Sequence, residues 1–411
     1  WYVDPYYHLD SSVYASYFPK DLANPNGARS QDDLVLPPLS ALDASRTTTD
    51  DQQTAGRASS GATLRIYRAA VAATGEYTAF FGGTKPLGQA AIVTAMNRVS
   101  GIYETELAIR MVLVGNNVNI VYTSAASDPY TNDDGFAMLD ENQTNVDAMI
   151  GNANYDIGHV FSTGGGGVAG LGVVGQSGFK AQGVTGSPSP TGDAFYVDYV
   201  AHEVGHQYGG NHTFNGVNGS AGGGNRYAPA AYEPGSGSTI MAYAGICGAD
   251  DLQSNSDAYF HAESLDEISD FVLTSGAGGN TQTATGNNIP TANAGADRAI
   301  PALTTFALTG SGTDADAGDT LTYNWEQYDL GPARALGSAD NGLSPLFRSF
   351  NSSTNPTRYF PSLPLILSNT SSSSEILPTV AHSGGSNLTF RLTVRDNRAT
   401  GAYNRDDMNI T

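Results

Sequence analysis

Alternating hydrophobic and polar residues predict several strands in the first two thirds of the chain. In 63–68, Leu64 and Ile66 alternate with polar residues, as expected for a strand with one buried face. Short apolar stretches predict further strands at 109–114, 118–121 and 157–161. Glycines interrupt the apolar stretch 168–172 that follows. These segments together predict a sheet.

Helical periodicity occurs between these strands. Apolar residues recur along one stripe of 88–100, and a second helix is expected over 140–150, before Gly151. A third helix begins near Asp193. A fourth is expected over 264–273, where Ser264 and Glu267 have the spacing of a capping box. The alternation of strands and helices predicts an α+β domain with a mixed sheet.

The pattern changes after residue 288. The preceding stretch, 275–288, is rich in Gly, Ser, Thr and Asn and is predicted to be a linker. Beyond it, short alternating strands are separated by turns, at 306–308, 321–325 and 388–394. This second pattern predicts an all-β sandwich domain.

The N-terminal segment differs from both of these regions. It contains Pro37-Pro38, scattered aromatic residues and then a polar stretch, 47–60, without periodicity. We therefore divide the chain into an N-terminal segment at 1–57, an α+β domain at 58–280 and a β-sandwich at 281–411. A permanently attached extension and a removable segment both remain open for residues 1–57.

Composition excludes some functions. The chain has 40 acidic and 19 basic residues and a net charge of −21, whereas nucleic-acid binding requires a basic surface. The sequence contains no run of about eighteen apolar residues, so no membrane span is expected. We therefore expect no nucleic acid as partner and no segment that spans a membrane.

The stretch from His202 to His212 carries the most specific chemistry. His202 and His206 are four residues apart, so on a helix both imidazoles lie on one face and can bind one metal ion. Glu203 can point at a water on that metal. Gly209 permits the positive φ at which a helix ends, and the chain can then return to deliver His212 as a third ligand. Three protein ligands and an open fourth position predict a catalytic zinc site rather than a structural one.

A second motif follows about thirty residues later. Ser238-Thr239-Ile240-Met241-Ala242-Tyr243 comes after a glycine-rich loop. Together the two motifs resemble the metzincin clan of zinc endopeptidases, and more narrowly its bacterial reprolysin-like members, whose zinc signature is followed by a methionine turn. The resemblance implies a metzincin catalytic domain in which Met241 is the floor of the zinc site and not a ligand. It also implies that the stretch ending in 168–172 is the edge strand that pairs with an extended substrate. A mobile loop without that role is the alternative for its glycine run.

The resemblance further implies a mechanism and substrates. Glu203 would be the general base for a water that attacks a peptide bond, and the substrates would be proteins or peptides. Tyr243 resembles the tyrosine that some metzincins place near the metal as an oxyanion donor, and a buried structural tyrosine is the alternative. Thr213 departs from the pattern, because reprolysins usually carry Asp, and astacins Glu, after the third histidine.

Other features of the chain resemble known modules more loosely. Residues 1–57 resemble the end of a propeptide, with cleavage expected near Arg57, so a latent zymogen is an alternative form of the enzyme. The C-terminal region resembles immunoglobulin-like modules of the polycystic-kidney-disease type. If that region carried the function, the protein would instead be an adhesin with a structural metal site.

Clusters of carboxylates suggest calcium at two places. Asp250, Asp251 and Asp257 crowd one short loop, and Asp314 and Asp316 lie before a predicted strand. Solvated acidic loops are the alternative at both places.

The remaining expectations concern the compartment and the assembly. The only cysteine, Cys247, cannot form an intrachain disulfide and is expected to be buried and inert. An N-glycosylation sequon, Asn211-His212-Thr213, overlaps the third ligand, so we expect a compartment without that modification. Together with the acidic, glycine-rich composition, this predicts a secreted bacterial protein, and we expect it to be a monomer.

Overall fold

The computed structural model describes residues 2–7, 10–17, 34–36, 60–277, 279–382 and 388–411. The expected cleavage point near Arg57 lies outside these residues. The N-terminal segment contributes the paired strands β1 (Tyr2–Tyr7) and β2 (Asp10–Tyr17), and a third strand, β3 (Leu34–Leu36), which joins the largest sheet.

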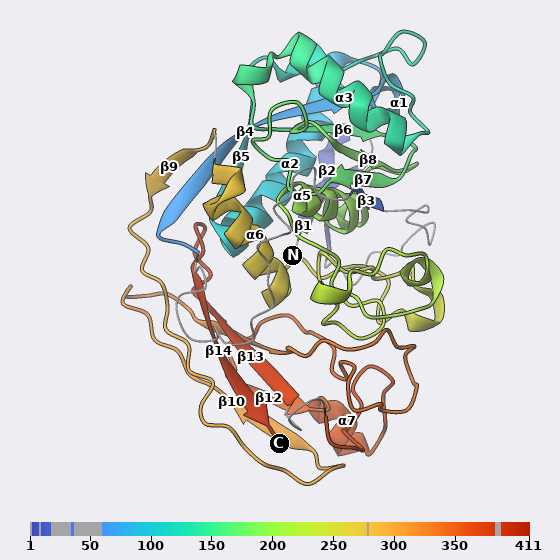
Figure 1. Ribbon diagram of the computed structural model, residues 1–411. Helices are drawn as coiled ribbons and strands as arrows, with labels where there is room; N and C mark the ends of the chain where they lie inside the picture. The colour runs from blue at the N-terminus through green and yellow to red at the C-terminus, as the bar shows by residue number, and fades with distance from the viewer. Residues whose placement is uncertain (1, 8–9, 18–33, 37–59, 278, 383–387) are drawn as a thin grey trace.

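The largest sheet is mixed, as the sequence predicts, and has the order β3-β7-β8-β6-β4-β5 (Figure 1). Its other strands are β4 (Thr63–Ala73), β5 (Ile109–Leu113), β6 (Ile157–Ser162), β7 (Gly167–Gly170), β8 (Gly183–Gly186) and β9 (Thr281–Ala284). Neighbours are parallel except at β7-β8 and β4-β9. Strand β7 is therefore antiparallel to β8, and β3 lies along its outer side.

Helices pack on this sheet around a large apolar core. They are α1 (Gly75–Phe80), α2 (Lys85–Leu107), α3 (Gly135–Met149), α4 (Asp193–Phe195), α5 (His202–Gln207) and α6 (Ala262–Leu273). A π-helical segment, η5 (Tyr196–Ala201), joins α4 to α5. Short 3-10 helices are η3 (Asn117–Ile120), η4 (Asn152–Asn154), η6 (Gly219–Gly222), η7 (Ala228–Ala230), η8 (Gly248–Asp250) and η9 (Ser275–Ala277).

The prediction of a strand at 118–121 is wrong, because most of this stretch is the 3-10 helix η3. The Asn117 side chain accepts a hydrogen bond from Val71 N at 2.8 Å and donates one to Val71 O at 2.9 Å. An amide that satisfies both backbone groups of a β4 residue takes the place of a neighbouring strand. Only Val121 retains a bridge to the sheet, at Ala73.

The predicted linker at 275–288 contains strand β9, which pairs with residues 63–66 of β4. All four β9 side chains are exposed, so their polar character gives no alternation that a sequence pattern could reveal. Backbone hydrogen bonds alone place this strand. Residues 281–284, which we assign from sequence to the sandwich, thus extend the large sheet.

The predicted capping box of α6 is also wrong. The helix begins earlier, and its N-cap is His261, whose side chain accepts a hydrogen bond from Glu263 N at 3.1 Å. Ser264 is buried within the helix. Glu267 accepts hydrogen bonds from Asn211 N and Nδ2, at 2.7 and 2.8 Å, and so ties the helix to the predicted metal ligands.

The C-terminal region contains two small antiparallel sheets, which partly support the predicted sandwich. One sheet has β10 (Phe306–Thr309) and β12 (Thr357–Phe360), and the other has β11 (Thr322–Gln327), β13 (Leu388–Arg395) and β14 (Tyr403–Ile410). A single core, which includes Trp325, Phe360 and Phe390, draws side chains from both sheets. Helix α7 (Leu363–Ser368) lies beside them.

The C-terminal sheets pack directly against the helices of the larger domain. Figure 1 shows β13 and β14 extending toward α6. Arg395 on β13 donates to the carboxylate of Glu106 on α2 at 2.8 and 2.9 Å, and both side chains are buried. Arg391, also on β13, donates to Asp266 on α6 at 3.0 Å. These ion pairs join β13 to α2 and α6 across the contact between the two regions.

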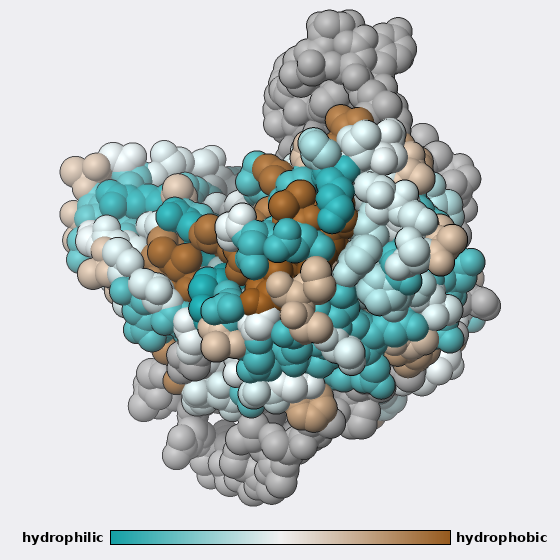
Figure 2. Space-filling view, turned by 90° about the horizontal axis from the view of Figure 1, so that it is seen from above, coloured by the Kyte–Doolittle hydropathy of each residue, from teal (hydrophilic) through white to brown (hydrophobic). Residues whose placement is uncertain are grey.

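The surface combines polar flanks with an apolar hollow on the face shown in Figure 2. Among the residues that the structure describes, no helix combines the length and hydropathy needed to cross a membrane.

Candidate metal centre

The segment 193–207 is helical throughout but changes its winding where the ligands begin. Six residues of π-helix precede α5, which starts at His202. Helix α5 ends at Gln207, with Tyr208 as its C-cap. Gly209 follows with a φ of +87°, a conformation that favours glycine. A Cβ at Gly209 would also lie 3.2 Å from Phe271 of α6. The turn that returns the chain toward His212 therefore requires glycine at this position.

The three predicted histidine ligands converge on one point. The Nε2 atom of His206 lies 3.0 Å from that of His202 and 3.0 Å from that of His212, and the third separation is 3.2 Å. All three side chains are buried. Ligands bound at about 2.0–2.1 Å in a tetrahedron would be about 3.3–3.4 Å apart, so these separations fit one zinc ion.

Backbone carbonyls decide which nitrogen of each ring carries its proton. The Nδ1 atoms of the three histidines lie 2.6 to 2.7 Å from carbonyl oxygens, in the pairs His202–Ile240, His206–Gly210 and His212–Asn225. A carbonyl oxygen can only accept, so each Nδ1 donates, and in the neutral ring the Nε2 atom then keeps its lone pair. Three lone pairs that face one another repel unless a cation lies between them. The donor set therefore fits a metal that binds imidazole nitrogen.

Met241 packs directly beneath the helix that carries two of the ligands. Its side chain is fully buried, and a Cβ placed on Gly205 would lie only 2.3 Å from its Sδ atom. Glycine at position 205 is thus the residue that allows this close approach between the turn and α5. The thioether contacts the ligand-bearing helix without being a ligand, as the resemblance implies.

Glu203 is fully buried in the helix turn between His202 and His206. The Tyr103 side chain of α2 packs against the same helical segment, and its hydroxyl donates to Ala201 O at 2.7 Å. Burial, and secondarily the Glu203 charge, raises the pKa of Tyr103 well above its ordinary value. A neutral tyrosine and a carboxylate thus lie close together beside the ligands.

Tyr243 is packed against the third ligand. Its ring lies 4.6 Å from the His212 ring and is stacked on Phe214 at 4.3 Å. It is fully buried, and it forms a small apolar cluster with Phe214, Ala221 and Cys247. The buried thiol agrees with the expectation of an inert cysteine, and Tyr243 supports His212 whatever the role of its hydroxyl.

Sequence reasoning missed Glu233, which supports the site from behind the ligands. Its buried carboxylate accepts hydrogen bonds from the Thr213 hydroxyl at 2.6 Å and from Ser238 N at 2.8 Å, and it also accepts from both the amide and the hydroxyl of Thr239. One side chain thereby joins the residue after His212 to the methionine turn. The absence of an acidic residue at position 213 was the signal that a carboxylate must come from elsewhere.

The carboxylates predicted to bind calcium near residue 250 do not form a ligand cluster in the described part of the chain. Asp250 accepts hydrogen bonds from Val217 N and Asn218 N, and Asp251 accepts from Gly245 N and Cys247 N. Carboxylates that accept backbone N–H groups are already satisfied as loop anchors. This placement counts against calcium at these two residues.

The second predicted calcium position does bring its carboxylates together. Asp314 and Asp316, with Asp319, have oxygen atoms within 4.8 Å of one another and are half-buried. The Arg398 side chain lies 2.8 Å from Asp319 and 3.6 Å from Asp316 and supplies positive charge there. Calcium at this position stays a prediction.

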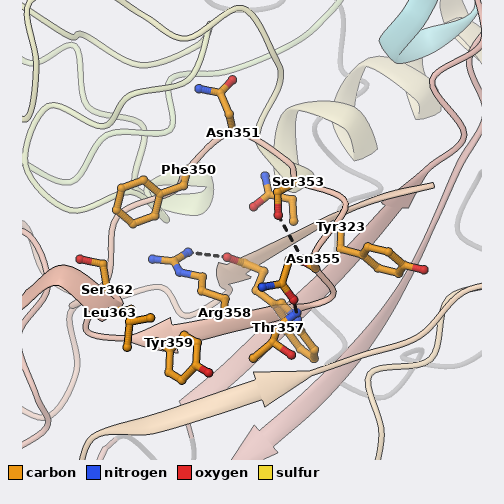
Figure 3. Close-up of a pocket in the computed structure, with 12 residues that line it drawn as sticks. Tyr323, Phe350, Asn351, Ser353, Asn355, Thr357, Arg358, Tyr359, Ser362 and Leu363 are labelled. Carbon is orange, nitrogen blue, oxygen red and sulfur yellow. Dashed lines mark hydrogen bonds between the residues drawn. The ribbon is translucent and has the colours of Figure 1, made fainter. Parts of the chain in front are cut away.

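A separate cavity of about 200 Å³ lies in the C-terminal region rather than at the histidines (Figure 3). Aromatic and amide side chains surround it, among them Tyr323, Phe350 and Asn351. Arg358 crosses it to donate to the Trp325 carbonyl. None of the lining residues belongs to either group that could hold a metal ion among the described residues.

The region that carries the three histidines is similar to a known protein family. Residues 86–271 match the family model described as metallo-peptidase family M12B, reprolysin-like. In this region the chain is similar to the reprolysin-like metallopeptidases. No curated protein matches the chain. A solved structure of a nucleoside hydrolase-related hypothetical protein from Saccharophagus degradans, associated with carbohydrate metabolism, is 12% identical. That match covers 85% of this chain and 99% of the other, but its TM-score of 0.20 is too low to support an inference about fold or function.

The reprolysin-like region includes α2 to α6 and with them every predicted zinc ligand. Strands β4 and β9 lie outside the matched residues but pair in the same sheet. The family supports zinc for the histidine triad, which is one of two groups in the described chain that could hold a metal ion. In this site the Thr213 hydroxyl donates to Glu233, so a carboxylate contacts the residue that follows the third histidine.

Proposed function

We propose that this protein is a zinc-dependent endopeptidase that hydrolyses peptide bonds with Glu203 as general base. The observation that carries the proposal is the convergence of three Nε2 atoms beside a buried glutamate, within a reprolysin-like region. His202, His206 and His212 would hold zinc, which would polarise the scissile carbonyl and make water more acidic.

The chain's own residues perform the proton transfers. Glu203 takes a proton from the attacking water and then passes it to the departing amine. The backbone carbonyls on each Nδ1 keep the three rings oriented throughout, because each ring can rotate only by losing its hydrogen bond. Tyr243 is proposed to support His212 and, as an oxyanion donor, to contribute to turnover.

Substrates are proposed to be proteins or peptides in extended conformation. We further propose that the protein is secreted by a bacterium and acts as a monomer, on the basis of its acidic, glycine-rich composition and single cysteine. The two-sheet C-terminal region is proposed to be an immunoglobulin-like module of the polycystic-kidney-disease type, with residues 58–280 as the catalytic unit, extended by β9.

The test of this function is hydrolysis of a broad protein substrate such as casein. Activity should be lost when zinc is removed by a chelator, and it should return when zinc is restored. The Glu203→Gln variant should bind zinc as the unaltered protein does but fail to digest casein. Chelator-resistant hydrolysis would contradict the proposal.

We propose latency as a second property of the same site, because the described N-terminal strand lies where a substrate is expected. Strand β3 pairs with β7 through Leu34–Val168, Val35–Ala169 and Leu36–Gly170. In the sheet order, β7 would be an edge without β3. An exposed edge strand can accept the backbone of an added peptide, and here residues 34–36 take that position.

The Val35→Pro variant tests latency without truncating the chain. Proline lacks the N–H and is poorly tolerated within a paired strand, so β3 should leave β7. Hydrolysis of a short peptide substrate should then rise, whereas Val3→Pro, in the separate pair of β1 and β2, should have no such effect. Equal activity of unaltered and Val35→Pro protein would refute latency and leave the endopeptidase proposal intact.

A further inference from the structure

The C-terminal region contacts the loop behind the third ligand through one short segment, residues 331–336. Four backbone groups of this segment are hydrogen-bonded to residues 215–250 at distances of 2.7 to 3.0 Å: Gly331 O with Arg226, Pro332 O and Arg334 N with Asn215, and Leu336 N with Asp250. Side-chain and backbone partners that recur along six residues indicate a fixed docking rather than a single chance contact.

Arg226 connects this segment to the metal centre. Its Nη2 donates to Gly331 O at 2.7 Å, and its Nε donates to the Asn215 side-chain oxygen at 2.8 Å. The residue before it, Asn225, provides the carbonyl that accepts the Nδ1 proton of His212 at 2.6 Å. A guanidinium is a rigid fork, so two acceptors in fixed places determine where residue 226 lies. That in turn determines where the Asn225 carbonyl points.

Asp250 fixes the other part of the same loop. Its Oδ2 atom accepts from Val217 N and Asn218 N, and its Oδ1 atom accepts from Leu336 N. Burial raises the pKa of Asp250, but these N–H donors more than offset it, so the pKa lies below its ordinary value. The carboxylate is therefore charged and holds the loop and the 331–336 segment together.

A close backbone approach completes this interface. Gly235 lies against Leu336, and a Cβ at Gly235 would be 2.7 Å from the Leu336 Cγ atom. Gly235 also has a φ of +60°. Gly235 lies two residues after Glu233, whose carboxylate joins Thr213 to the methionine turn. The 331–336 segment thus packs on both chain segments that support the third ligand.

We propose that the 331–336 segment is part of the zinc site and that Arg226 is the positioning residue through which it orients His212. The C-terminal region then completes the metal centre in addition to any binding role of its own. This inference rests on the proposed zinc function, since the property it concerns is the affinity of the three histidines for zinc.

The test is the zinc affinity of full-length Arg226→Ala, measured without substrate by competition with a chromophoric chelator. Arg226 acts on His212 only through the Asn225 carbonyl, so its loss should weaken zinc binding by about tenfold, the lower end of the 10–100-fold range for groups that bond a ligand directly. Arg226→Lys keeps the charge and can reach one acceptor, so it should lie between Ala and the unaltered chain. Arg348→Ala is the matched control, because Arg348 also joins the C-terminal region to residues near 250, at Gln253, but does not lead to His212.

The outcomes separate this inference from the proposed function. Weaker zinc binding in Arg226→Ala, with unchanged binding in Arg348→Ala, supports the inference. Equal zinc affinity of Arg226→Ala and the unaltered chain overturns it, even if both digest casein. An equal loss in Arg226→Ala and Arg348→Ala also overturns it, because the effect would then follow from domain contact in general. Absence of zinc binding in the unaltered chain would instead overturn the proposed function itself.

Discussion

Glu233 should be the side chain outside the ligand set on which the site depends most. Its carboxylate accepts from two buried backbone amides, Ser238 N and Thr239 N, and from the hydroxyls of Thr213 and Thr239. Glu233→Ala leaves both amides without an acceptor, at about 1–3 kcal/mol each. Two amides and the space left behind give a loss of roughly 3–6 kcal/mol in the free energy of unfolding.

Glu233→Gln is the matched variant, since the geometry predicts a much smaller effect. The two amides bond to Oε2, whereas the two hydroxyls bond to Oε1. A glutamine can place its oxygen toward the amides and its NH₂ group toward the hydroxyls, which can turn to accept. Only the charge assistance is lost, so the expected cost is roughly 1–2 kcal/mol.

Urea unfolding followed by tryptophan fluorescence measures both variants, in a Glu203→Gln background that prevents self-digestion. The Ala variant should unfold at a clearly lower urea concentration than the Gln variant, and its zinc affinity should fall with it. That fall is expected because Thr213 adjoins His212 and Thr239 adjoins Ile240, whose carbonyl orients His202. The reasoning is refuted if Ala and Gln have the same midpoint, or if Ala leaves zinc affinity unchanged.

Three further substitutions test separate parts of the account. Gly205→Ala should destabilise the protein by about 1–2 kcal/mol, because crowding against Met241 outweighs the better helix propensity of alanine; a higher melting temperature would contradict this. Tyr243→Phe should lower kcat more than it raises KM in casein hydrolysis, and an unchanged kcat would restrict Tyr243 to packing. Burial lowers the pKa of His159 to about 4, so its contribution to stability is present above pH 6.5 and is lost as pH falls toward 4. Urea unfolding of His159→Gln at several pH values tests this. The variant should show a smaller pH dependence of the free energy of unfolding over that range, by up to about 1.4 kcal/mol per pH unit. An unchanged pH dependence would mean that His159 is not neutral in the folded protein.

The histidine ligands could be predicted from sequence because their geometry is local. His202 and His206 are one helical turn apart, and Gly209 permits the positive φ that returns the chain to His212. The methionine turn could be recognised because its spacing from these residues is characteristic of the clan. Each of these signals lies within about forty residues of the others, so no knowledge of the distant chain was needed.

The groups that orient the ligands could not be predicted in the same way. Each histidine donates to a backbone carbonyl, and a carbonyl is present at every residue, so nothing in the sequence distinguishes Ile240, Gly210 or Asn225. Glu233 is one of many acidic residues until the fold places it against Thr213. The 331–336 segment contacts the loop mainly through backbone groups, so its sequence does not reveal this contact either.

The errors in the fold have the same origin. Strand β9 has exposed polar side chains and is held by backbone pairing to β4, so its composition predicts a linker. The stretch at 118–121 has the apolar alternation of a strand, but the Asn117 side chain satisfies the backbone groups of Val71 that a strand would bind. In both places, contacts over long sequence separations override the local pattern.

The central claim is that Glu203 acts as the base at a zinc site formed by His202, His206 and His212. The most direct measurement compares casein hydrolysis by zinc-loaded Glu203→Gln and by the unaltered protein at equal, measured zinc content. The account predicts full zinc occupancy in both and loss of nearly all hydrolysis in the variant. Hydrolysis by Glu203→Gln at the rate of the unaltered protein would contradict it.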